Sequence, residues 1–348
     1  DQTFFTIPQA SIALDTEVGD GIGLHVQYDY STDAPNGLPG GRGVGLNEAY
    51  LFVDELFGDI GGKIGGFALP FQSWEFNGAF RSLDMTITPS AKNTLLERAR
   101  VIGLQLQKTK DVDPADVKWS FMRFNGADVA AANAGAIAFA GGGGIGTMSD
   151  ATGLGALSRS TTFDDSMGFG IDIESGENPD RNWGWRFGYV DLGGDTSALP
   201  AVAPAGGFPA GLGNSMDISA FQVGFWWKND NFKVVFEWVD GENEFANIPG
   251  GGGEIEINSF YLLVNFKMND DTSLTLRYDD WENEIPGVGG GAAAGDEGDA
   301  ITFAWNRRVS DTSMFQFEYV APDTDVINNV GAGGSDTDDD LIQFRYKV

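Results

Sequence analysis

The chain has 348 residues, of which 51 are acidic and 21 basic, giving a formal net charge of −30. A surface of that sign repels polyanions, so the composition excludes a protein that binds DNA or RNA. Cysteine is absent, which excludes disulfides and thiolate metal sites, whereas 50 glycines and 26 phenylalanines favour many strands joined by turns.

The first twenty residues show only a weak alternation, at Ile12, Leu14 and Val18. A strong pattern begins after Gly21, where apolar side chains occupy every second position and polar ones lie between them. One face of this first block carries Ile22, Leu24, Val26, Tyr28 and Tyr30, and the other carries His25, Gln27 and Asp29.

Blocks of about ten residues repeat this pattern to the end of the chain, followed alternately by a short polar turn and a long glycine-rich connection. They cover residues 47–55, 60–69, 100–107, 117–124, 167–173, 183–189, 221–227, 232–238, 260–266, 274–281, 301–309, 315–320 and 341–348. The alanine- and glycine-rich run at 129–148 predicts a flexible loop, because these residues gain little from lipid.

In residues 232–238, Phe232, Val234, Phe236 and Trp238 alternate with Lys233 and Glu237, so we expect the first set to face lipid and the second to face water. A soluble sandwich would give the same alternation. The number of blocks, the alternating connections and the Trp and Tyr residues near strand ends favour a membrane barrel.

The sequence therefore predicts an all-β protein, a transmembrane antiparallel up-and-down barrel of about 14 to 16 strands in the bacterial outer membrane. Residues 21–348 form the barrel, and residues 1–20 form an extra hairpin or a periplasmic cap. The chain starts without a basic and apolar leader, which predicts a mature protein lacking its signal peptide. The predicted lumen wall comprises His25, Asp29, Glu48, Lys63, Arg186, Lys233, Glu237, Arg277, Arg308 and Arg345.

A family resemblance is found in Asn-Glu-Ala-Tyr-Leu-Phe-Val at 47–53, Gly-Gly-Phe-Ala-Leu-Pro-Phe at 65–71 and Trp-Glu-Phe at 74–76. This stretch resembles the phosphate-selective-porin-like families of outer-membrane porins. The resemblance implies a trimeric porin in which residues 70–96 fold inward and narrow the channel. The charged residues of that segment, predicted to form the constriction, are Glu75, Arg81, Asp84 and Lys92. Phosphate selectivity does not carry over, because the inward positions mix both signs of charge.

These expectations describe a passive channel for small polar solutes and ions, weakly cation-preferring because acidic side chains exceed basic ones. It would act without catalysis or a cofactor, beside lipopolysaccharide and two further copies of the chain. Calcium is a candidate ligand of the acidic external loops, at 296–299, 323–325 and 336–340, although none has the spacing of a helix-loop-helix calcium site.

Two other functions stay open. One is a secreted acidic β-rich surface protein that binds calcium, for which short repeats of fixed period would be expected and are not found. The other is a barrel hydrolase using His25, the single histidine, near Gln27 and Asp29. No Gly-x-Ser-x-Gly motif accompanies this histidine.

Overall fold

The computed structural model describes residues 9–31, 43–68, 74, 85–86, 100–127, 162–175, 182–195, 215–246, 253–285, 294–310, 313–327 and 340–347. In these ranges the chain is built from strands and turns, and it contains no helix suited to crossing a bilayer.

In the described part of the chain, fifteen strands make one antiparallel sheet, in which each strand pairs with its neighbours in the sequence. They are β1 (Gln9–Gly19), β2 (Ile22–Ser31), β3 (Gly43–Phe57), β4 (Ile60–Ala68), β5 (Arg100–Val112), β6 (Ala115–Ala127), β7 (Thr162–Ser175), β8 (Trp183–Asp195), β9 (Ser215–Lys228), β10 (Phe232–Ala246), β11 (Gly253–Asn269), β12 (Thr272–Ile285), β13 (Ala294–Ser310), β14 (Ser313–Ile327) and β15 (Leu341–Lys347). The predicted all-β up-and-down architecture is confirmed. The fourteen strands expected after Gly21 are β2–β15, and β1 adds a fifteenth.

Connections of two or three residues follow every odd-numbered strand except β7, and connections of six residues or more follow the even-numbered strands. Gly21 and Gly58 have φ of 68° and 66° in two such turns, a conformation that glycine adopts without a steric penalty. In the turn after β9, the side-chain Oδ1 of Asn229 accepts bonds from the backbone N–H groups of Asn231 and Phe232, at 2.9 and 2.8 Å. All the short turns therefore lie at one end of the sheet.

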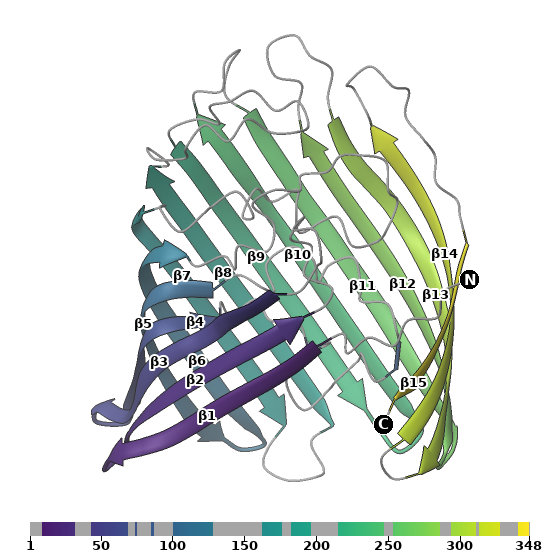
Figure 1. Cartoon of the computed structure of the whole chain (residues 1–348), viewed down its shortest axis with the longest axis horizontal. Coiled ribbons are helices and arrows are strands. Elements are labelled where there is room, and N and C mark those ends of the chain that lie inside the picture. The colour runs from purple at the N-terminus through teal and green to yellow at the C-terminus, as the bar shows by residue number, and fades with distance from the viewer. Residues whose placement is uncertain are drawn as a thin grey trace.

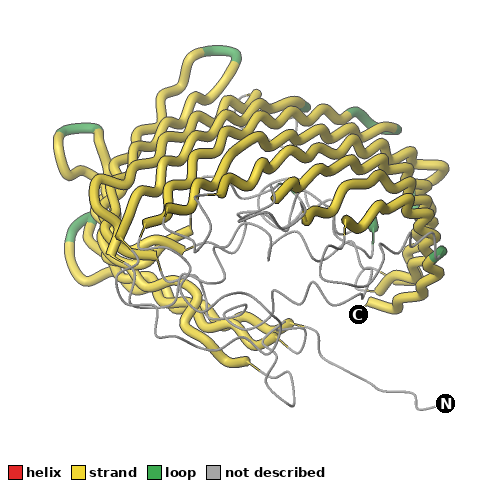
Figure 2. Tube along the Cα trace, turned by 90° about the horizontal axis from the view of Figure 1, so that it is seen from above, coloured by secondary structure: helices red, strands yellow, loops and turns green. Residues whose placement is uncertain are grey.

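The sheet curves round as the wall of a barrel, with β1 and β15 as its two edges in the described residues (Figures 1 and 2). Successive side chains on each strand alternate between the convex and the concave face. One of these faces carries large apolar side chains on strands from β1 to β15. Its large exposed side chains include Leu14, Leu51, Ile64, Phe121, Trp185, Phe221, Leu262, Leu276, Phe303, Phe315 and Phe344.

The opposite face carries most of the buried polar side chains, among them Gln222, Glu237, Arg277, Asp279, Asn306 and Glu318. This distribution is the reverse of a soluble protein, in which large apolar groups are withdrawn from the surface. An apolar outer face and a polar inner face are typical of a transmembrane β-barrel, whose wall meets lipid on the outside.

Candidate functional site

Three described residues of the 70–96 segment lie against the concave face of the sheet. Trp74 contacts β8–β10, while Met85 and Thr86 contact β12, β13 and β15. A short stretch of chain can meet this many strands only from the side toward which they curve. The segment therefore folds inward at these positions, as predicted.

Trp74 forms the first attachment and is 1% exposed. Its ring lies under the Arg186 guanidinium, whose carbon is 4.8 Å from the ring centroid, and Arg186 Nε donates to Asp172 Oδ1 at 2.6 Å. On β9, a Cβ added to Gly224 would lie 2.6 Å from Trp74 Cζ3. Only glycine at position 224 leaves room for the indole, so the sheet provides a slot for this side chain.

Glu237 on β10 is the polar centre of this attachment and is completely buried. Its Oε1 accepts bonds from the Trp74 backbone N–H at 3.4 Å and from Gln222 Nε2 at 3.2 Å. Its Oε2 accepts a bond of 2.5 Å from the Tyr261 hydroxyl. Glu237 faces inward as the alternation predicts, yet the inward segment shields it from water, so the expectation that it faces water is not met.

Thr86 and Met85 form the second attachment, through donors on three strands. Arg277 Nη1 donates to Thr86 Oγ1 at 3.2 Å, and Asn306 Nδ2 donates to the Met85 carbonyl at 2.9 Å. Arg345 Nη2 donates to the Thr86 carbonyl at 3.1 Å. The segment is thus held at two places, each by charge-assisted or amide hydrogen bonds.

The Arg277–Asp279 ion pair beneath Thr86 is fully buried, with 2.7 Å between Arg277 Nε and Asp279 Oδ2. Two charges excluded from water depend on each other, because either one alone would keep its desolvation cost without its partner. The Arg277 guanidinium also donates to Thr302 Oγ1 at 3.4 Å. Arg277, predicted as a lumen-wall residue, faces inward but is covered.

His25 belongs to a separate group on the inward face of β1–β4. Its Nδ1 lies 2.6 Å from Asp15 Oδ1, and its ring stacks on Tyr50 with centroids 4.8 Å apart. Lys63 Nζ lies 4.5 Å from the centroid of the same Tyr50 ring. Four adjacent strands therefore contribute a carboxylate, an imidazole, a phenol and an ammonium group to one strip.

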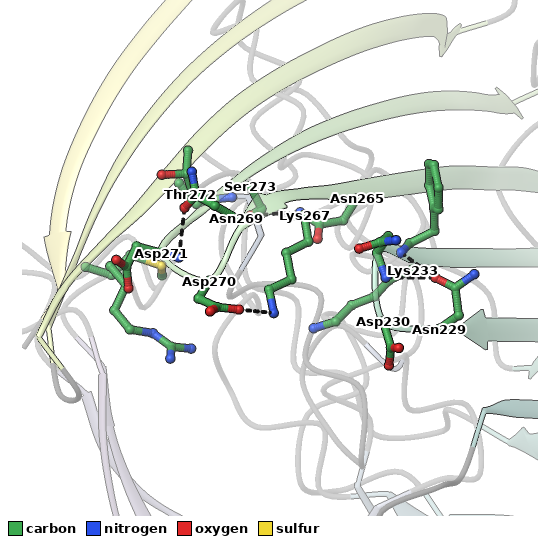
Figure 3. A pocket seen from close by; sticks show the side chains of 15 residues that line it. Asn229, Asp230, Lys233, Asn265, Lys267, Asn269, Asp270, Asp271, Thr272 and Ser273 are labelled. Carbon is green, nitrogen blue, oxygen red and sulfur yellow. Dashed lines mark hydrogen bonds and ion pairs between the residues drawn. The ribbon is translucent and has the colours of Figure 1, made fainter.

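A pocket of about 160 Å³ lies at the short-turn end of β9–β14 (Figure 3). Lys233 and Arg308, both predicted for the lumen wall, line it together with Lys267 and the turn residues Asp230, Asp270 and Asp271. Lys267 Nζ donates to Asp270 at 2.7 Å. This bond, with the nearby charges of Lys267 and Arg308, lowers the pKa of the exposed Asp270 carboxyl. Both signs of charge are present in equal number in this pocket.

The other predicted residues are placed as follows. Glu48 lies on the inward face of β3, opposite Gln27 on β2, and Asp29 lies on β2, where only its backbone is described. Arg345 lies on β15, and its Nε donates to Gln316 Oε1 at 2.6 Å. The predicted constriction residues Glu75, Arg81, Asp84 and Lys92 lie outside the described residues. The described residues contain no group of three or more His, Asp or Glu side chains arranged to hold a metal.

Sequence reasoning missed several uncharged members of the inward network. Gln222, Tyr261, Asn306 and Gln316 all bond to the groups that hold the segment or to each other. Trp226 was also missed, because it directly precedes the outward Trp227 and aromatic side chains were expected on the outward face alone. Alternation could have placed these residues inward, but only the position of Trp74 shows why large polar and aromatic groups are needed there.

No protein-family model matches the sequence. No curated protein matches it either. Solved structures do match its fold. The outer membrane channel DcaP of Acinetobacter baumannii is 10% identical with a TM-score of 0.55, over 97% of this chain and 84% of that one.

OmpT, an outer membrane protein of Vibrio cholerae, is 12% identical with a TM-score of 0.53, over 97% of this chain and 86% of its own. The trimer form of that protein is 12% identical to this chain with a TM-score of 0.51, over 97% of this chain and 88% of its own. The fold is that of outer-membrane β-barrels. Identities this low establish the fold alone, so function is argued from the residues.

Proposed function

We propose that this protein is an outer-membrane porin, a passive diffusion channel for small polar solutes and ions. The observation that carries the proposal is the reversed polarity of the fifteen-stranded sheet. Large apolar side chains are exposed on its outward face, and charged and amide groups gather on its inward face. Such a wall separates hydrocarbon from a polar interior, which is what a water-filled pore requires.

The 70–96 segment is proposed to form the constriction. Its attachments at Trp74 and at Met85–Thr86 support this role, because these residues are bonded to the inward face of the wall. Glu75, Arg81, Asp84 and Lys92 would then set the local charge at the narrowest point. These four charges nearly cancel, so the segment itself would discriminate little between cations and anions.

A weak cation preference is proposed from the excess of acidic side chains over basic ones. At ~0.15 M salt, screening limits the effect of surface charge to about 8 Å, so the preference should weaken as salt rises. We further propose a homotrimer in the outer membrane, in contact with lipopolysaccharide, with calcium as a candidate ligand of the acidic external loops. The trimer form found among the similar structures supports the proposed homotrimer.

Planar-bilayer recording on the purified full chain tests the proposed function. We expect discrete conductance steps and, at low salt, a reversal potential on the cation side. Migration that changes on boiling should accompany this activity, because folded barrels resist detergent unfolding. A chain that migrates as a folded barrel but never conducts would sink the porin proposal, and a clear anion preference at low salt would overturn the charge argument.

Deletion of residues 77–92 tests the constriction. The shortened chain should conduct more than the full chain, because less material would obstruct the pore. A deletion of equal length within residues 128–161 serves as the control for chain length. Unchanged conductance in a folded 77–92 deletion would show that this segment is not the constriction.

A further inference from the structure

The charged side chains on the inward face of the sheet form two groups, on two walls, that differ in access to solvent. We call β8–β15, the part of the sheet against which Trp74, Met85 and Thr86 lie, the covered wall, and β1–β7 the open wall. At mid-height on the covered wall, Glu237, Arg277, Asp279 and Glu318 are 0% exposed. On the open wall the side chains of Asp15 and Asp172 are 67% and 32% exposed.

The charged groups of the covered wall are shielded from solvent by the inward segment and by the side chains to which they are hydrogen-bonded. Trp74, Met85, Trp226, Val235, Tyr261 and Leu263 form one buried cluster against it. Its charged groups are engaged in this packing, as Glu237 binds the Trp74 backbone and Arg277 binds Asp279 and Thr86. A permeating ion would have to displace the segment before it could meet these charges.

The open wall carries a different set of charges. Asp15, Glu48, Asp116, Asp172 and Glu174 face inward there. Asp15 lies opposite His25, Glu48 opposite Gln27, Asp172 opposite Lys118 and Arg186, and Asp116 opposite Glu174. The inward lysines of this wall, among the described side chains, are Lys63 and Lys118, and Asp172 is paired with Arg186 on the adjoining strand β8. Glu48 and Lys118 both lie within electrostatic range of Lys63. Carboxylates therefore outnumber ammonium and guanidinium groups on the wall that solvent reaches.

We infer that the open wall lines the path of permeating solutes, and that its inward charges, with Glu48, Lys63 and Lys118 as the principal groups, determine ion selectivity. The inference rests on the proposed channel function. It assigns Glu237, Arg277 and Asp279 to holding the inward segment, and it removes them from contact with solute. Cation preference then arises inside the pore, from Glu48 and its neighbours, as well as from the external loops.

Cysteine labelling during bilayer recording tests this assignment, because the natural chain has no cysteine to interfere. Glu48→Cys and Lys118→Cys probe the open wall. Ser259→Cys and Ala300→Cys probe the covered wall, where both residues are 0% exposed and the new side chain is small. The reagents are a cationic and an anionic methanethiosulfonate, added to conducting channels.

On the open wall we expect rapid labelling that shifts the reversal potential in the direction of the charge added. The anionic reagent should restore cation preference in Glu48→Cys, and the cationic reagent should lower it. On the covered wall labelling should be roughly tenfold slower or more, because a buried thiol reacts only after local opening. Fast labelling and a shifted reversal potential at Ser259→Cys, with no shift at Glu48→Cys, would overturn the inference.

Charge-neutral variants provide a second measurement that requires no labelling. Glu48→Gln should reduce the cation-to-anion permeability ratio and Lys63→Gln should raise it, both at salt concentrations where external loops are screened. Unchanged ratios in both variants would refute the role of the open wall while leaving the porin proposal intact. Absence of conductance in the unmodified chain would refute the porin proposal, and the inference with it.

Discussion

The covered and open walls are built from the same kind of strand, yet their inward charges have different environments. Arg277 on the covered wall lies beneath Thr86 and pairs with a carboxylate that is equally shielded. Lys63 on the open wall lies over Tyr50 and reaches a strip that includes the well-exposed Asp15. The difference teaches that alternation fixes which way a side chain points, whereas packing from above fixes whether it meets water.

The largest difference between the walls should appear when one charge of each is removed. Arg277→Met leaves Asp279 buried without its partner and should reduce the free energy of unfolding by about 3–5 kcal/mol. Lys63→Met removes a cation–π contact and should cost about 1 kcal/mol or less. Urea unfolding in detergent micelles, followed by tryptophan fluorescence, measures both. Equal losses would show that the two walls do not differ in this way.

The outward faces of the two walls should behave alike, because both meet lipid. Phe236→Arg on β10 and Ile64→Arg on β4 should each cost about 2–4 kcal/mol if their sites lie near mid-membrane, since the new charge enters hydrocarbon. Gln27→Arg, inward on the open wall, is the matched control and should cost little. Folding yield into lipid vesicles reports these effects. A Phe236→Arg chain that folds as well as Gln27→Arg would contradict the assigned orientation.

A smaller effect is expected from adding one methyl group to an inward glycine. Gly224→Ala places a Cβ 2.6 Å from Trp74 Cζ3 and should destabilise the protein by about 1–3 kcal/mol through overpacking. Gly168→Ala, on the inward face of β7, would put its Cβ no closer than 3.6 Å to the nearest atom and should be nearly neutral. Unfolding curves compare the two variants. If Gly224→Ala also displaces Trp74, its conductance should rise.

The smallest effect concerns the short turns, where the two walls should not differ because both turns are exposed. Lys108 and Lys267 donate to Asp59 and Asp270 respectively, and these bonds lower the pKa of each carboxyl. A lowered pKa adds stability that is present above the unfolded-state pKa and is lost as the pH falls through the folded-state value. Lys108→Met and Lys267→Met should therefore be slightly less stable than the natural chain near neutral pH and indistinguishable from it in strong acid. A stability difference that grows on acidification would contradict this assignment.

The strand pattern was predictable from the sequence in most of the molecule. In β10, Phe232, Phe236 and Trp238 alternate with the inward Lys233 and Glu237. The outward residues of β10 lie opposite outward residues of β9 and β11. The hairpin of β5 and β6 was predicted too short, because polar residues 108–111 resemble a turn. In the structure Lys108 and Lys110 pair with Trp119 and Val117, and the turn shrinks to residues 113–114.

The candidate site was predictable only in part. The inward direction of Arg186, Glu237 and Arg277 follows from alternation, and the motif at 65–71 with Trp74 indicated an inward segment. The partners of these residues did not follow, because Trp74 and Glu237 are 163 positions apart and Thr86 and Arg277 are 191 apart. No local pattern encodes contacts of that separation.

The sequence by itself determined the strands, their order and the face on which each side chain lies, because a period of two is a local property of extended backbone. The tertiary structure decided which wall the inward segment covers, and therefore which charges become structural and which remain open to solvent. That choice depends on the curvature that brings β8 to β15 around Trp74, Met85 and Thr86. It also depends on the space above Gly224, which exists only once the sheet is formed.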